Sequence, residues 1–384
     1  MSDPFKHTEL RLVTPEYDSD LTEIVMKLQY LRRHTLGGST PPPIFFQLKA
    51  LFHMLESLNS TRIEGNRTTI AEAIEARIEP QSQESESLRE IHNNEAAMRF
   101  IEEQIVGATR ISKGFVRELH KMVVDGLSPP PNGEGDRTPG QFRKGNVSIA
   151  RSTHQPPDIA VLQDYLDEFF VFINDPPDQK LDLLRIAIAH HRFAWIHPFN
   201  NGNGRVVRLI TYALLISRGF DVRTGRILNP SAIFCSDRDH YYDMLGCADL
   251  GTDEAILTWC QYVLQGLFDE LSKIDKLVDY DFLRDRILKP AIAHCRVSHI
   301  ISEVESDILL IAVEKTIFQA SDVATVLPTR HPSQRSRVLR HMREKRLIEP
   351  VKKNGRKYVI RFSNSLLTRG FIQALASEGF ISLE

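Results

Sequence analysis

A polar, glycine-containing loop between two strongly apolar helical segments is the feature that most constrains the fold. The first segment covers residues 181–196, and the second covers residues 203–218 and stops at Gly219. Apolar residues at helical spacing also cover much of the remaining sequence up to about residue 275. Because this periodicity is that of helices, the sequence predicts a mainly α fold over this region.

The other helices are predicted from the same periodicity and from their end signals. One amphipathic helix, about residues 45–65, follows three prolines and ends at a Gly-Asn stop. Further helices are expected at residues 70–77, 87–105, 112–124, 159–173 and 253–273. Residues 128–140 are rich in Pro and Gly and predict a long loop, whereas alternation over residues 142–150 predicts a short β-hairpin.

The pattern changes at about residue 305. Helices at residues 306–315, 319–326 and 332–345 precede two short strands at 347–351 and 358–362, joined by a turn at 353–356. Three helices followed by a hairpin are typical of a winged helix-turn-helix. We therefore expect an N-terminal helical region (1–105), a core (106–275), a helical linker (276–304) and a winged-helix domain (305–384).

Composition adds a cellular expectation. The chain has 384 residues, which exceeds the size at which a single hydrophobic core usually stops growing, so more than one domain is expected. Its net charge of −2 is ordinary for a globular protein. Its four cysteines show neither a CxxC pair nor zinc-ligand spacing. The N-terminus has no apolar core region, and the longest apolar run, residues 308–313, is too short to span a bilayer. These features predict reduced thiols, no membrane segment and a cytoplasmic location.

The loop between the two central helices has three features that suit phosphate chemistry. Gly202 and Gly204 allow successive N–H groups to point into one concavity at a helix N-terminus, where the dipole favours an anion. Arg205 and Arg208 are three residues apart, so both can face one polyphosphate. His197 precedes the loop, and its imidazole can accept a proton at neutral pH. Taken alone, a GxG is more often a turn, a histidine more often structural and paired arginines more often solvated.

The combined string, residues 197–208, resembles the Fic signature HPFx(D/E)GN(G/K)RxxR at every fixed position but one. Residues 119–120, residues 139–143 and the expected hairpin resemble the approach to that signature, and the resemblance covers about residues 45–270. It implies a Fic-type helical core with a β-hairpin flap. Such a core transfers AMP from ATP to a Ser, Thr or Tyr hydroxyl of a target protein bound near Val147 to Ile149.

The resemblance also implies roles for residues of the loop. His197 would deprotonate the hydroxyl, which attacks the α-phosphate and releases pyrophosphate. The α-phosphate would be held by Asn203 and by the amides of Gly202 and Gly204, and the outer phosphates by Arg205 and Arg208. Tyr241 and Tyr242 resemble the segment that lines the adenine pocket, and we assign that role to Tyr242. Aromatic core packing is the alternative for either tyrosine.

Asn201 is the position that departs from the signature. It stands where the family usually has an acidic ligand for Mg²⁺ or Mn²⁺. A neutral amide oxygen is a weaker ligand for a hard cation than a carboxylate. Either a weak metal site is completed by phosphates and water, or the protein binds nucleotide with little transfer. We favour the first, because the rest of the signature is intact.

Residues 60–65 resemble the inhibitory motif (S/T)xxxE(G/N) of the family, here N-terminal to the core. Glu64 lies in the last turn of its predicted helix, where the dipole disfavours an anion and a cationic partner would relieve the cost. The resemblance implies that Glu64 pairs with Arg208 and blocks the γ-phosphate, while Ser60 lies one turn away on the same face. A solvated surface glutamate is the alternative.

Positive charge is concentrated near the C-terminus. Residues 328–361 contain twelve Lys and Arg against two Glu, a net charge of +10, whereas the whole chain has −2. A basic helix and wing of this kind are typical of DNA binding, and docking to an acidic protein surface is the alternative.

The sequence therefore predicts two candidate functions. The first is an autoinhibited protein adenylyltransferase that acts on a target, on itself or in reverse. The second is a nucleotide-sensing, DNA-binding regulator whose Fic domain is weakly active or inactive. The sequence leaves open the target, the preferred nucleotide and whether the chain forms a homo-oligomer.

Overall fold

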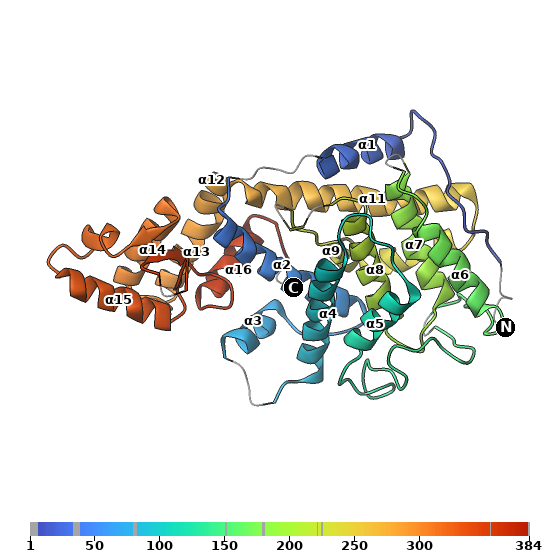
Figure 1. Cartoon of the computed structure of the whole chain (residues 1–384), viewed down its shortest axis with the longest axis horizontal. Coiled ribbons are helices and arrows are strands. Elements are labelled where there is room, and N and C mark those ends of the chain that lie inside the picture. The colour runs from blue at the N-terminus through green and yellow to red at the C-terminus, as the bar shows by residue number, and fades with distance from the viewer. Residues whose placement is uncertain are drawn as a thin grey trace. The chain divides into compact units, whose positions relative to one another are not determined.

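The computed structural model (Figure 1) describes residues 7–33, 39–79, 83–149, 152–178, 181–220, 222–223, 226–353 and 355–382. The chain forms two compact units, each built from discontinuous segments. One comprises Met1–Thr35, His53–Arg67 and Ser85–Ser272, and the other comprises Leu36–Phe52, Thr68–Glu84 and Lys273–Glu384. Helix α2 (Pro42–Ile63) therefore contributes its first half to the second unit and its second half to the first.

Among its described residues the first unit contains helices and loops but no strand, which confirms the predicted mainly α fold. Besides the end of α2, its helices are α1 (Asp20–Arg33), α4 (Glu86–Gln104), α5 (Lys113–Val123), α6 (Leu162–Ile173), α7 (Asp182–Ile196), α8 (Asn203–Ser217), α9 (Ser231–Ser236), α10 (Arg238–Ala248) and most of α11 (Asp253–Asp275).

Helices α7 and α8 form the centre of this unit. Every residue of α8 except Gly204 is buried, and every residue of α7 except Ala194 is buried. Helix α8 packs against α4, α5 and α7, and α6 packs on α7 (Figure 1). Most of the residues that these two helices bury are apolar, and their buried polar side chains make hydrogen bonds or ion pairs. The loop between them is consequently fixed by the core at both ends.

Helix α5 turns one face to this core. It begins at Ser112, whose hydroxyl accepts a hydrogen bond from the Phe115 N–H at 3.1 Å, a normal N-cap. Its buried residues are Val116, Leu119, His120 and Val123, at the i, i+3, i+4 and i+7 spacing of one helical face. His120 therefore points inward, toward the loop that joins α7 to α8.

The second unit combines helices with a three-stranded antiparallel sheet in the order β1-β3-β2. Ile348 of β2 and Phe318 of β1 pair with Ile360 and Tyr358 of β3. Its elements after the first half of α2 are α3 (Ile70–Ile78), η1 (Lys276–Val278), α12 (Tyr280–Phe282), η2 (Leu283–Leu288), α13 (Lys289–Val297), α14 (Glu303–Lys315), β1 (Phe318–Gln319), η3 (Asp322–Ala324), α15 (Pro332–Glu344), β2 (Ile348–Pro350), β3 (Lys357–Ile360) and α16 (Leu367–Ser377).

The helix predicted at residues 319–326 is wrong. Phe318 and Gln319 form strand β1, and only Asp322–Ala324 makes a single helical turn. The Asp322 carboxylate accepts the Gln319 N–H at 2.8 Å, so a side chain takes the backbone donor and turns the chain. Pairing with β3 then decides the conformation of a short apolar segment that local pattern assigned to a helix.

The hairpin predicted at residues 142–150 is also wrong over the part that the structure describes, residues 142–149, where no paired strand occurs; Ala150 lies outside the described residues. The Arg143 N–H donates to the Pro198 carbonyl at 2.8 Å, and its guanidinium donates to the Gly145 carbonyl at 2.9 Å. A side chain and the α7–α8 loop therefore take the bonds that a partner strand would have made.

The four cysteines are free thiols, as their spacing predicted. Within the described ranges, no helix has both the length and the apolar character needed to cross a bilayer.

Candidate active site

The loop between α7 and α8, residues 197–202, has a fixed and unusual backbone. Helix α7 ends at His197 with φ 50° and ψ 60°, a left-handed conformation that is uncommon for a residue with a side chain. Gly202, at φ 75°, precedes α8. The Asn203 amide donates to the Phe199 carbonyl and accepts the Phe199 N–H, both at 2.9 Å. Asn203 therefore shapes the loop in this structure.

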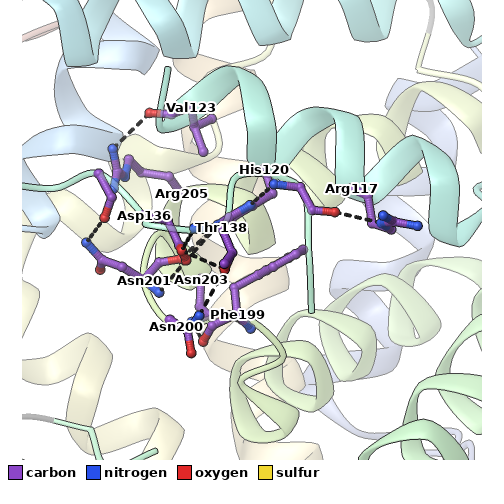
Figure 2. Close-up of polar contacts among 12 residues, drawn as sticks. Arg117, His120, Val123, Asp136, Thr138, Phe199, Asn200, Asn201, Asn203 and Arg205 are labelled. Atoms are coloured by element: carbon purple, nitrogen blue, oxygen red, sulfur yellow. Dashed lines mark hydrogen bonds and ion pairs between the residues drawn. The ribbon is translucent and has the colours of Figure 1, made fainter. Parts of the chain in front are cut away.

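Two side chains hold the backbone of Asn201, and Figure 2 shows them converging on it. His120 Nε2 donates to the Asn201 carbonyl at 3.1 Å, and the Asn201 N–H donates to Asp136 Oδ2 at 3.2 Å. Asp136 is itself fixed, because its Oδ1 accepts the Thr138 N–H at 2.7 Å. We call His120 and Asp136 the loop clamp. It ties α5 and the Pro/Gly-rich segment to the loop.

The loop clamp requires a neutral histidine. The Gly140 N–H donates to His120 Nδ1 at 2.9 Å, so the ring proton lies on Nε2. Burial lowers the pKa of His120 to about 4, while the Asn201 carbonyl and Asp136 act in the opposite direction. The ring stacks on Phe199 with centroids 3.8 Å apart. His120 is therefore uncharged at neutral pH, and it stabilises the loop by stacking on Phe199 and by its hydrogen bond to the Asn201 carbonyl.

His197 is half-buried and also neutral at pH 7. Burial lowers its pKa to about 4, although a hydrogen bond to the Ala194 carbonyl and the charge of Glu64 raise it. A neutral imidazole carries a proton on one ring nitrogen only, so the other can act as an acceptor. Arg143 Nε donates to the His197 carbonyl at 3.0 Å and holds the backbone at this point. The geometry suits a residue that takes a proton.

The first turn of α8 already carries an anion, the carboxylate of Glu64. A Cβ placed on Gly204 would overlap Glu64 Oε1 and would lie 3.2 Å from Arg208 Nη1. The absence of a side chain at Gly204 thus lets Glu64 approach the backbone where α8 begins. A helix N-terminus attracts negative charge, so the Glu64 carboxylate lies where the dipole of α8 favours an anion.

Arg208 holds Glu64 in that place. Its Nη2 lies 2.7 Å from Glu64 Oε1 and donates to the Ser60 carbonyl at 2.7 Å, and its Nε donates to the Ser60 hydroxyl at 2.8 Å. Burial would raise the pKa of Glu64, but the Arg208 guanidinium outweighs burial and lowers it. The predicted pairing of Glu64 with Arg208, with Ser60 on the same face, is present.

Arg205 has different surroundings from Arg208. Its guanidinium is fully buried and donates to the Val123 carbonyl at 3.1 Å and the Glu134 carbonyl at 2.5 Å (Figure 2). Its Nη1 lies 3.1 Å from Glu90 Oε1, and burial raises the pKa of Glu90 despite this pair. Arg205 therefore joins α4, α5 and the Pro/Gly-rich segment, and its part in phosphate binding stays a prediction.

Tyr242 lies near the end of α2. Its hydroxyl donates to the Ile63 carbonyl at 3.3 Å, and the Arg238 guanidinium lies 5.5 Å from its ring centre. The ring is 42 % exposed, whereas the neighbouring Tyr241 is buried and contacts His190 through its hydroxyl at 2.9 Å. Tyr241 is thus a core residue, and Tyr242 alone presents an aromatic face that could meet a base.

The side chain of Asn201 contacts a carboxylate that the sequence analysis did not single out. Its Nδ2 donates to the Gly135 carbonyl at 3.1 Å and lies 3.3 Å from Glu134 Oε2. Glu134, Asp136 and Glu90 were all missed. The signal for the first two was the run Gly133 to Asp136, which places two carboxylates in a glycine-rich loop.

Comparisons with known proteins agree with this geometry. Residues 110–215 match the model of the Fic/DOC family. The protein adenylyltransferase Fic of Drosophila virilis is 30 % identical over 200 residues, which is 50 % of this chain and 37 % of the relative. That of Drosophila grimshawi is 29 % identical over 197 residues, with the same shares. The chain thus spans little more than a third of the length of these relatives.

Two solved structures share the fold. A Fic family protein from Desulfovibrio desulfuricans G20 has a TM-score of 0.55 at 18 % identity, covering 92 % of this chain and 98 % of its own. Fic-1 from C. elegans has a TM-score of 0.50 at 21 % identity, covering 66 % and 70 %. At these identities the likeness shows the fold alone.

Proposed function

We propose that the chain, whose residues 110–215 match the model of the Fic/DOC family, is an autoinhibited protein adenylyltransferase. It would move AMP from ATP to a Ser, Thr or Tyr hydroxyl of a target protein, or of itself. One observation carries the proposal: a neutral His197 adjoins a glycine-lined helix start that now holds the Glu64 carboxylate.

The chemistry follows from these groups. The hydroxyl oxygen of the target forms a bond to the α-phosphorus of ATP while its proton passes to the free nitrogen of His197. The bond from the α-phosphorus to the oxygen that bridges to the β-phosphate breaks, and pyrophosphate leaves. The amides at the start of α8, with Gly202 and Gly204, would hold the α-phosphate. The target would bind beside Val147 to Ile149.

We propose a weak site for Mg²⁺ or Mn²⁺ at Asn201. Its amide oxygen is a donor of the kind that these cations prefer, although the signature carboxylate is missing. The nearby Glu134 carboxylate faces the Asn201 amide nitrogen at 3.3 Å, so it lies on the other side of the amide from that oxygen. When bound with ATP, the cation would neutralise charge on the phosphates. Asn201 would be its protein ligand, with water and phosphate completing the set.

Autoinhibition follows from competition for Arg208. While Glu64 is paired with Arg208, this guanidinium is withheld from the outer phosphates, and ATP cannot align for in-line attack. Removal of the carboxylate frees both Arg208 and the space above Gly204.

The test is label transfer from α-phosphate-labelled ATP with Mg²⁺ or Mn²⁺. Glu64→Gly should increase self-labelling by about tenfold or more, the equivalent of one charged hydrogen bond released to the transition state. The double variant Glu64→Gly, His197→Ala should be silent. Glu79→Gly is the matched control, since Glu79 is an exposed glutamate at the end of another helix, α3. If Glu64→Gly folds, binds ATP and labels no better than the wild type, autoinhibition by Glu64 is wrong.

A second candidate function rests on the C-terminal sheet and helices. The order α14, β1, η3, α15, β2, β3, with β3 central, is the arrangement expected of a winged helix. Exposed basic residues on α15 and beyond it have no acidic partner among the described residues. They are Arg337, Arg340, Arg343, Arg346, Lys352, Lys353, Arg356 and Lys357. We propose that these residues bind duplex DNA. If, in addition, neither the wild type nor any variant transfers AMP, the chain would be a nucleotide-sensing regulator. Retention of a DNA duplex by the full chain at low salt tests this.

A further inference from the structure

The C-terminal end of α7 has an unusual set of hydrogen-bond partners. The last carbonyls of a helix have no partner within the helix itself. Here the Trp195 carbonyl lies 2.8 Å from His154 Nε2, and the His197 carbonyl accepts from Arg143. Both of these partners are basic side chains that approach from the segment between α5 and α6.

His154 is held in its doubly protonated form by this geometry. Its Nδ1 lies 3.1 Å from Asp249 Oδ2, and its Nε2 lies against the Trp195 carbonyl. Both partners can only accept, so both ring nitrogens must carry a proton. Asp249 is fixed in turn, because its Oδ1 lies 2.8 Å from Nε2 of the buried His191.

The electrostatics agree with this assignment. Burial disfavours the cation of His154, but Asp249 outweighs burial and raises the pKa of His154. The pKa of Asp249 falls to about 2 although burial opposes this, because His154 and His191 both hydrogen-bond to it. A cation at the C-terminal end of a helix is also favoured by the helix dipole.

We propose that His154, kept as an imidazolium by Asp249, is a positioning residue for His197, which it orients by capping α7 and keeps in the neutral form that accepts a proton. This inference rests on the proposed role of His197 as the base. It is independent of the identity of the target and of the metal.

The charges that face His197 show how His154 would keep His197 neutral. Two cations, His154 and Arg143, lower the pKa of His197 in addition to burial, and one anion, Glu64, raises it. Binding of ATP would add phosphates near the helix start, which favour protonation of His197. The positive charge of His154 would counter that effect. His197 could then still accept a proton with the nucleotide bound.

Two variants separate capping from charge, and both are made in the Glu64→Gly background. His154→Gln keeps an N–H that can reach the Trp195 carbonyl but removes the charge, whereas His154→Ala removes both. The titration midpoint of the His197 ring, followed by NMR, should rise in both variants by on the order of half a pH unit. Turnover at pH 8 should be close to the parent for His154→Gln and several-fold lower for His154→Ala.

An unchanged His197 midpoint in His154→Gln would overturn the electrostatic role. Equal turnover of the two variants at pH 8 would overturn the capping role. His341→Gln, at an exposed histidine of α15, is the matched control and should change neither quantity. If His154→Ala fails to fold, His154→Gln still decides the electrostatic part. If the parent labels nothing while the midpoint shifts, the proposed transferase fails and the coupling of His154 to His197 stands.

Discussion

At position 204 a single methyl group would report whether Glu64 lies on α8 in solution. A Cβ there would overlap Glu64 Oε1 and crowd Arg208, whereas helix propensity alone favours Ala over Gly by about 1 kcal/mol. We therefore expect Gly204→Ala to lower the free energy of unfolding by about 1–3 kcal/mol. In Glu64→Gly the same substitution should cost clearly less, because the carboxylate is gone. Urea unfolding of the four proteins of this cycle measures the difference. Additive effects would place Glu64 away from α8.

Asn201 is the proposed protein ligand for a cation. Asn201→Asp, in the Glu64→Gly background, is expected to lower the metal concentration for half-maximal label transfer by about tenfold, because a carboxylate replaces an amide oxygen. The variant loses the donor to the Gly135 carbonyl, so its stability should fall by about 1 kcal/mol. Asn200→Asp adds the same charge at the exposed neighbour and serves as the control. Identical metal titrations for the two variants would exclude Asn201 as a ligand.

The contacts of a single residue could be predicted from the sequence where the chemistry of its side chain and its position in the signature indicated the same role. The contact of Arg208 with Glu64 could be predicted, because an anion in the last turn of a helix needs a cation and the signature supplied one. The surroundings of Arg205 could not. Its partners are the Val123 and Glu134 carbonyls and the Glu90 carboxylate, which lie on segments distant in sequence, and neither distant backbone groups nor a distant glutamate can be found from a local pattern. The loop clamp could not be predicted either. Residues 119–120 are part of the resemblance, but the sequence does not indicate which groups His120 contacts.

Among the elements, the contact of α5 with the α7–α8 loop should make stability depend on pH. The His120 pKa is about 4 when folded and about 6.5 when unfolded, so between these values the unfolded chain binds the additional proton. The stabilisation is complete above pH 6.5 and is lost as pH falls toward 4, by about 1.4 kcal/mol for each pH unit. His197 adds a dependence of the same sign.

His120→Gln should therefore reduce the slope of unfolding free energy against pH by up to one proton between pH 4 and 6.5. Urea unfolding at several pH values measures this slope. His341→Gln, at an exposed site, should leave the slope unchanged. A slope that is the same in His120→Gln and the wild type would show that His120 is not kept neutral by its burial.

The long helices and the strand pair β2–β3 were predicted well, whereas residues 142–149 and 318–319 were not, for a physical reason. A helix makes its hydrogen bonds within one segment, so the periodicity of α7 and α8 is sufficient to locate them. The bonds of residues 142–149 go instead to the Arg143 side chain and the Pro198 carbonyl. Strand β1 likewise exists only because β3 lies beside it. Such partners are set by the tertiary structure and cannot be seen in local alternation.

Across the whole molecule, positive charge is concentrated in residues 328–361. Elsewhere in the second unit, several basic side chains have acidic partners: Arg286 lies 2.8 Å from Glu378, and Lys315 lies 2.6 Å from Asp322. The exposed basic residues of α15 and the β2–β3 connection have none among the described residues. Charges paired within a unit contribute to its own structure, whereas unpaired like charges repel and favour a partner of opposite sign.

The size of the salt effect identifies that partner. Each phosphate contact on duplex DNA contributes about 0.9 to the slope of log affinity against log salt concentration. The variant with Arg337→Ala, Arg340→Ala and Arg343→Ala should bind a DNA duplex more weakly and with a slope smaller by about 3. The control carries Arg286→Ala, Lys289→Ala and Lys315→Ala, which removes the same charge from residues with acidic partners, and its slope should match the wild type. Fluorescence anisotropy of a labelled duplex over a salt series measures both. A slope that falls equally in the two variants would reflect net charge alone, and no binding at about 50 mM salt would favour an acidic protein as the partner.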